Sequence, residues 1–84
     1  EVLRKANAYA VWAKAATELG RFDEALSLLE KANSYDKSDE RRLQLADAQV
    51  NVGRLQRGID MYRQLSQSVR VGKQARAAMA AAAR

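Results

Sequence analysis

Apolar residues recur along the chain at spacings of three and four, which is the period of a helix with one buried face. From Tyr9 the apolar positions continue through Trp12 and Ala16 to Leu19, and Gly20 then ends the run. Glycine suits a helix end because it adopts the left-handed backbone conformation without strain. The pattern therefore predicts a helix that ends at Gly20.

Four further segments show the same helical period, and the second of them is preceded by residues suited to capping, Ser38 or Asp39. No segment alternates as a strand does, and the connections are too short for anything but antiparallel neighbours. The sequence predicts an all-α fold of about five helices. The further segments span about residues 23–34, 39–53, 55–68 and 73–84.

The chain also repeats itself at a distance of 33 residues. The segment Gly20-Arg21-Phe22 recurs as Gly53-Arg54-Leu55, and Trp12 falls on Leu45. At the other matched positions apolar residues fall on apolar ones and small residues on small ones. A period in the low thirties with helical patterning indicates a solenoid of helix–turn–helix repeats.

The repeated residues resemble the tetratricopeptide repeat family, most specifically in Gly20-Arg21-Phe22-Asp23-Glu24-Ala25-Leu26. The resemblance implies antiparallel helical hairpins stacked as a right-handed solenoid. It divides the chain into a first repeat at about residues 6–38, a second at 39–72 and the first helix of a third at 73–84. On this interpretation residues 1–84 are a fragment of a longer array. The matching positions are Trp12, Ala13, Gly20, Phe22, Ala25, Leu29 and Ala32, then Leu45, Ala46, Gly53, Leu55, Gly58 and Tyr62.

The resemblance also implies a concave face, lined by the first helix of each repeat, that binds a protein or peptide partner. Neighbouring repeats of the same chain are the other partners that it implies. The aromatic residues Tyr9, Trp12, Phe22 and Tyr62 lie on the apolar stripes, so we expect them to fill the seams between helices. The candidate concave-face binding residues are Asn7, Lys14, Thr17, Glu18, Gln44, Asp47 and Asn51.

The net charge of +5 is unevenly distributed. Residues 1–40 carry 6 Lys/Arg and 8 Asp/Glu, whereas residues 41–84 carry 9 and 2. An excess of arginine suits carboxylate and phosphate groups, so an anionic polymer, either polysaccharide or nucleic acid, is the alternative partner. Nucleic-acid binders also interleave stacking aromatics, and Tyr62 is the only one in the basic half. The candidate basic patch is Arg54, Arg57, Arg63, Arg70, Lys73 and Arg76.

Candidate chemistry is sparse. The chain has no Cys and no His, so it lacks a thiol nucleophile and the commonest general base and metal ligand. It shows no phosphate-binding glycine loop and no metal-ligand spacing. We therefore expect no catalytic, cofactor-binding or metal-binding residue. No apolar run approaches the ~20 residues of a membrane-spanning helix, so we expect no span.

Arg outnumbers Lys by 10 to 5, and Ala and Gln are abundant. In this respect the repeats are similar to those of long bacterial envelope proteins, where periplasmic tetratricopeptide arrays recruit exopolysaccharide-modifying enzymes. The proteins in question export Pel-type polysaccharide, cellulose or poly-N-acetylglucosamine. This resemblance implies a non-catalytic scaffold in the periplasm, with the cytoplasm as the alternative compartment.

Overall fold

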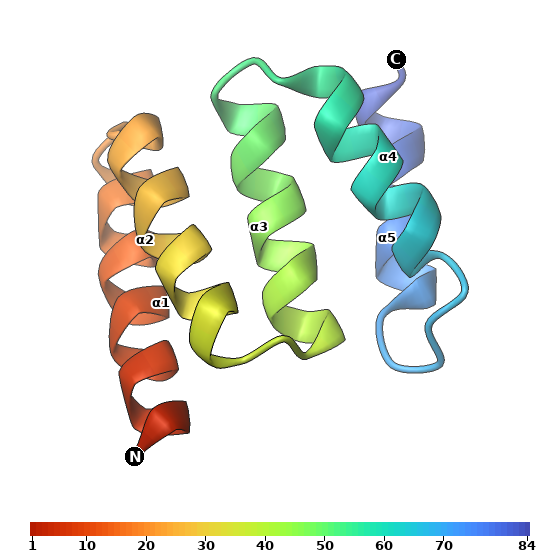
Figure 1. Cartoon of the computed structure of the whole chain (residues 1–84). Helices are drawn as coiled ribbons and strands as arrows, with labels where there is room; N and C mark the ends of the chain where they lie inside the picture. The colour runs from red at the N-terminus through yellow and green to blue at the C-terminus, as the bar shows by residue number, and fades with distance from the viewer.

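Five α-helices and no strand make up the structure, a computed structural model that describes residues 1–84. Each helix runs antiparallel to the one before it, so two hairpins stand side by side and the last helix packs on the second hairpin (Figure 1). The predicted all-α fold of antiparallel helical hairpins is confirmed. In chain order the helices are α1 (Val2–Glu18), α2 (Phe22–Tyr35), α3 (Asp39–Asn51), α4 (Leu55–Leu65) and α5 (Gly72–Ala82).

The two hairpin turns have the same construction. Gly20 and Gly53 have φ angles of 78° and 89°, in the left-handed region that favours glycine. After Gly20, the backbone N–H of Arg21 donates to the carbonyl oxygen of Ala16 at 2.8 Å, which closes the end of α1. The turn at Gly53 repeats this arrangement, in agreement with the 33-residue period. The sequence therefore located both turns correctly.

Only one of the five helices, α3, begins with a side-chain cap. Ser38 caps α3, because its hydroxyl accepts a hydrogen bond from the backbone N–H of Arg41 at 3.4 Å. This confirms one of the two predicted caps. By contrast α1 begins at Val2, well before the apolar pattern that starts at Tyr9. Its first residues are mostly Ala, Leu, Arg and Lys, which favour helix without a buried face. None of the five helices is long and apolar enough to cross a bilayer.

The core consists of two clusters built mainly from Ala and Leu. In the first cluster α2 packs between α1 and α3, and its leucines bury against alanines on both sides. In the second cluster α4 and α5 pack on α3. Small residues at the crossing points let the helices approach closely. The first cluster comprises Ala13, Ala16, Ala25, Leu26, Leu28, Leu29, Leu45 and Ala48, and the second Ala46, Tyr62, Leu65, Val71 and Ala75.

Two of the four aromatic residues that were predicted to fill seams between helices do not do so. Tyr62 is 3% exposed and fills a seam, and Tyr9 is half-buried against the first core cluster. Trp12 is 56% exposed and Phe22 is 39% exposed, so the prediction that they fill seams is wrong. Among the five helices α1 packs on α2 alone, and Trp12 is not among the residues of the first core cluster. The matching residue Leu45 is only 8% exposed, because it belongs to the core cluster in which α2 packs against α3.

Gly58 lies where α4 crosses α3 at short distance. A Cβ atom there would stand 2.4 Å from Cγ2 of Val50 and 3.2 Å from the carbonyl oxygen of Ala46. We expect Gly58→Ala to lower the free energy of unfolding by about 1–2 kcal/mol, since overpacking outweighs the ~1 kcal/mol gained in helix propensity. Urea denaturation measures this change. Combining it with Val50→Ala should recover part of the loss, and a more stable single variant would contradict the steric argument.

Candidate functional site

A groove of about 680 Å³ runs between α1 and α3. Leu29 of α2 also lines it, and every other lining residue comes from α1 or α3, the first helices of the two hairpins. All seven candidate concave-face residues line this groove. The structure thus brings together Asn7, Lys14, Thr17, Glu18, Gln44, Asp47 and Asn51. That these residues bind a partner remains a prediction.

Arg41 is a groove residue that the sequence reasoning did not include in the set. Its guanidinium donates hydrogen bonds to the side-chain oxygen of Asn7 on α1 and to Oε1 of Gln44 on α3, the latter at 3.0 Å. The same group lies 3.5 Å from a carboxylate oxygen of Asp36. At the 33-residue period Arg41 corresponds to Ala8, which does not line the groove. The sequence position of Arg41 therefore did not indicate that its side chain would reach the groove. Its long side chain reaches around the helix, which a position-by-position comparison cannot register.

The hydrogen bonds of Arg41 decide what the groove amides offer to a partner. Because the oxygens of Asn7 and Gln44 already accept from the guanidinium, their NH₂ groups are left to donate. Further along, Lys14 and Glu18 are exposed and form no ion pair. The groove therefore presents amide donors near Asn7 and Gln44, and a cation and a carboxylate one helical turn apart further along α1.

The groove also has apolar surface between its polar groups. Val11 is 70% exposed and lines the groove beside Ala10. Ala48 faces it from α3. A partner with both hydrogen-bonding groups and small apolar side chains would match this surface. No group of three or more His, Cys, Asp or Glu side chains is placed to hold a metal ion.

Asp47 is held in the groove by a residue of the neighbouring helix. The buried Tyr62 of α4 donates its hydroxyl proton to Oδ1 of Asp47. Burial raises the pKa of the Asp47 carboxyl above its usual value, and the hydrogen bond from Tyr62 partly offsets that rise. The pKa of Tyr62 is raised well above its usual range by burial, by this hydrogen bond and by the charge of Asp47. The sequence indicated Tyr62 as a core residue but not its bond to a groove carboxylate.

The raised pKa of Tyr62 predicts a loss of stability in alkali. An unfolded tyrosine ionises near pH 10, whereas folded Tyr62 keeps its proton to higher pH. The folded state then binds more protons than the unfolded state, so its contribution is complete below about pH 10 and is lost as the pH rises further. We expect the difference in urea midpoint between the native chain and Tyr62→Phe to shrink between about pH 9 and pH 11. Parallel midpoint curves would contradict this assignment.

The candidate basic patch draws its residues from several parts of the second half of the fold. Its six residues are all exposed: Arg54 lies in the α3–α4 turn, Arg57 and Arg63 on α4, Arg70 in the α4–α5 connection, and Lys73 and Arg76 on α5. Half of them are already engaged. Arg63 lies 3.2 Å from Asp60, Arg70 lies 3.4 Å from Glu40, and Arg76 donates to the carbonyl oxygen of Ser66 at 2.8 Å. Arg54, Arg57 and Lys73 form no ion pair.

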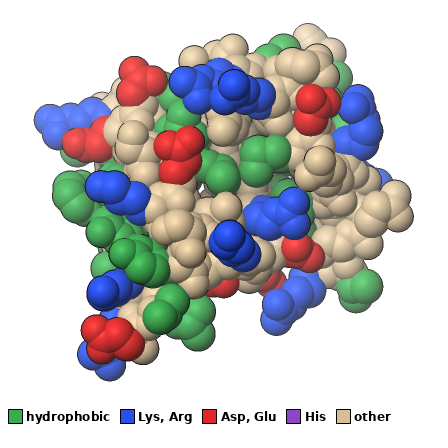
Figure 2. Space-filling model, viewed as in Figure 1, with side chains coloured by type: hydrophobic (Ala, Val, Ile, Leu, Met, Phe, Trp, Pro, Cys, Tyr) green, Lys and Arg blue, Asp and Glu red, His purple; other side chains and the backbone are tan.

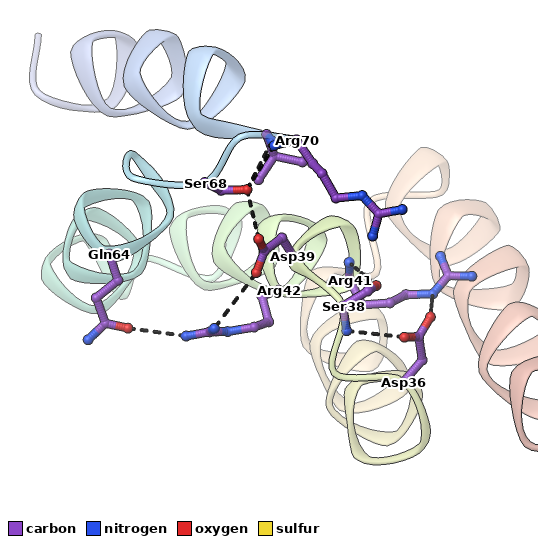
Figure 3. A network of polar contacts seen from close by, with 9 residues as sticks. Asp36, Ser38, Asp39, Arg41, Arg42, Gln64, Ser68 and Arg70 are labelled. Carbon is purple, nitrogen blue, oxygen red and sulfur yellow. Dashed lines mark hydrogen bonds and ion pairs between the residues drawn. The ribbon is translucent and has the colours of Figure 1, made fainter.

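Other arginines of the basic half belong to a structural network at the start of α3 (Figure 3). Asp39 accepts a hydrogen bond from the hydroxyl of Ser68 at 2.7 Å and lies 3.9 Å from Arg42. The Ser68 oxygen in turn accepts from the backbone N–H groups of Arg70 and Val71. The network joins the start of α3 to the α4–α5 connection. These contacts give several of the basic side chains a role within the fold.

Comparison with known protein families matches residues 16–82 to the tetratricopeptide repeat. The matched segment runs from the end of α1 through α5 and contains both glycine turns. No curated protein and no solved structure matches the chain. The family match covers most of the chain and agrees with the observed helical hairpins, and we conclude that the chain belongs to the tetratricopeptide repeat family.

Proposed function

We propose that this chain is a scaffold that binds a peptide segment of a partner protein in the groove between α1 and α3. Tetratricopeptide repeats generally mediate protein–protein interaction. The observation that carries the proposal is the convergence of seven polar residues, taken from two helices, on one groove.

The mechanism that we propose is binding to a surface formed in advance. The walls of the groove are helices fixed by the core. Within the groove Arg41 holds Asn7 and Gln44 in place, and Tyr62 of α4 holds Asp47 from outside. Side chains that are already ordered cost little further entropy on association. The amide donors suit peptide carbonyl oxygens, Lys14 suits an acidic side chain, and Glu18 suits a basic one.

A peptide library displayed on phage would test the proposal. We expect selected peptides to lose about 5- to 30-fold in affinity when Lys14→Glu or Gln44→Ala is introduced, as for central interface residues. Lys37→Glu is the matched control, because it makes the same charge change outside the groove lining. Binding that is insensitive to both Lys14→Glu and Gln44→Ala would contradict the proposal. Capture of only nucleic acid or anionic glycan, lost at high salt, would support the polymer alternative instead.

A narrower form of the proposal is that the partner is a periplasmic enzyme that modifies an exopolysaccharide during secretion. What supports it is composition alone, namely the excess of Arg over Lys in degenerate repeats. Deleting the gene should then abolish secretion of the modified polymer. Complementation with the native gene should restore secretion, and complementation with the Gln44→Ala gene should not. Normal secretion in the deletion strain would contradict this form and leave the groove proposal intact.

A further inference from the structure

The groove between α1 and α3 changes in hydrogen-bonding character along its length. Near Asn7 and Gln44 it offers amide NH₂ donors, because the oxygens of both amides accept from Arg41. The helices α1 and α3 run in the same direction, so both of them finish at the other end of the groove (Figure 1). We call the residues that line this other part the acceptor end: Thr17, Glu18, Asp47 and Asn51.

The acceptor end offers mainly oxygens that are ready to accept. The hydroxyl of Thr17 donates its proton to the carbonyl oxygen of Ala13 at 2.9 Å, so its oxygen is left to accept. Oδ1 of Asp47 accepts from Tyr62, whereas Oδ2 of Asp47 accepts no hydrogen bond within the chain. The carboxylate of Glu18 is exposed and unpaired. What this end lacks is therefore a group that donates several hydrogen bonds.

The acceptor end also carries an unbalanced negative charge. Lys14 lies one turn before Glu18 and offsets one of the two carboxylates of Glu18 and Asp47, and none of these three residues forms an ion pair. Glu18 and Asn51 are the last residues of α1 and α3, and neither helix has a basic residue in its last turn. The negative ends of two helix dipoles therefore add to the one remaining charge, and a single cation would balance it.

We infer that the segment bound in the groove places one basic side chain, an arginine in preference to a lysine, between Glu18 and Asp47. The guanidinium suits this place because it carries five N–H donors and pairs well with carboxylates, whereas the lysine ammonium carries three and is more strongly hydrated. This inference rests on the proposed function, since the segment must first lie in the groove. It adds the chemical class of the residue that anchors the segment.

The charge of the rest of the chain limits the segment to one basic residue. The chain has a net charge of +5, and on the face seen in Figure 2 the acidic side chains lie among lysine and arginine side chains. A segment with several basic residues would be repelled by this surface. Asn7 and Glu18 stand ~16 Å apart along α1, at ~1.5 Å per residue, a distance that about five residues of extended peptide span. The basic residue is therefore expected among neutral or acidic neighbours within a short segment.

Two heptapeptide libraries displayed on phage test the inference, one with arginine and one with glutamine fixed at the central position. We expect the native chain to select tight binders from the arginine library. Replacing the fixed arginine of a selected peptide by glutamine should weaken binding at least about 10-fold, as for a residue at the centre of an interface. Replacing it by lysine should weaken binding less, because the charge is kept.

Variants of the two carboxylates locate the arginine. Glu18→Gln and Asp47→Asn should each weaken the arginine peptide about 3- to 10-fold and leave the glutamine version of that peptide unaffected. Asp47→Asn keeps an oxygen that accepts from Tyr62, so it retains the contact to α4. Glu30→Gln is the matched control, because Glu30 is an exposed carboxylate of α2 that does not line the groove.

The outcomes separate this inference from the proposed function. Peptides that lose affinity in Gln44→Ala, yet are indifferent to the fixed arginine or to both Glu18→Gln and Asp47→Asn, would overturn the inference and leave the groove proposal intact. If neither library yields a peptide sensitive to Gln44→Ala, the proposed function is contradicted and the inference fails with it.

Discussion

Replacing Leu45 by Ala is expected to lower the free energy of unfolding by about 2–4 kcal/mol. Leu45 is 8% exposed and packs in the core cluster that joins α2 to α3, so its loss leaves a cavity between the two hairpins. A domain of this length has a stability on the order of 4–12 kcal/mol. The change should therefore remove a large part of it, and urea denaturation followed by circular dichroism measures the loss.

The matched control for Leu45 is Trp12, which occupies the same place one period earlier. Trp12→Ala removes a larger side chain, yet we expect it to change stability by less than about 1 kcal/mol because the ring is 56% exposed. Both variants should be measured at the same protein concentration and in the same buffer. A loss from Trp12→Ala equal to that from Leu45→Ala would show that Trp12 packs against a helix after all.

This pair of residues also shows what the sequence could and could not predict. Helical period, glycine turns and the Ser38 cap depend on residues close in the chain, and all were predicted correctly. The groove set was expected from the family resemblance, which places the groove along the first helix of each repeat, and its members do line one groove. The burial of Trp12 was predicted wrongly because burial depends on what lies next to a helix, and the apolar stripe of α1 is the same whether or not a neighbour is present.

Side-chain reach explains the remaining omissions. Arg41 was not in the predicted groove set, and Tyr62 was predicted only as a core residue. Their polar ends act at a distance from those positions, on Asn7 and Asp47 respectively. The charge difference between the two halves of the sequence is smaller in the structure for a related reason. Ion pairs such as that between Arg70 and Glu40 cross the boundary between the halves, so a count along the chain overstates the free positive charge.

Tyr62→Ala is expected to have the largest effect of any single change, about 3–5 kcal/mol lost from the free energy of unfolding. Tyr62 is 3% exposed and belongs to the second core cluster, where α3, α4 and α5 meet. Removing its ring would leave a cavity at the contact of three helices. Urea denaturation should show the loss directly, and a change below about 1 kcal/mol would contradict the placement of the ring.

Tyr62→Phe is the matched control that keeps the ring and removes the hydroxyl. Its cost should be about 1–3 kcal/mol, since a hydrogen bond to an ionised acceptor is stronger than a neutral one. The expected order is therefore native, then Tyr62→Phe, then Tyr62→Ala. Tyr62→Phe should also affect the groove without unfolding it, because Asp47 loses the donor that fixes its carboxylate. If peptide affinity changes in Tyr62→Phe while the circular dichroism spectrum does not, then a core residue of α4 positions a binding residue of α3. If affinity is unchanged, Asp47 lines the groove without contributing to recognition.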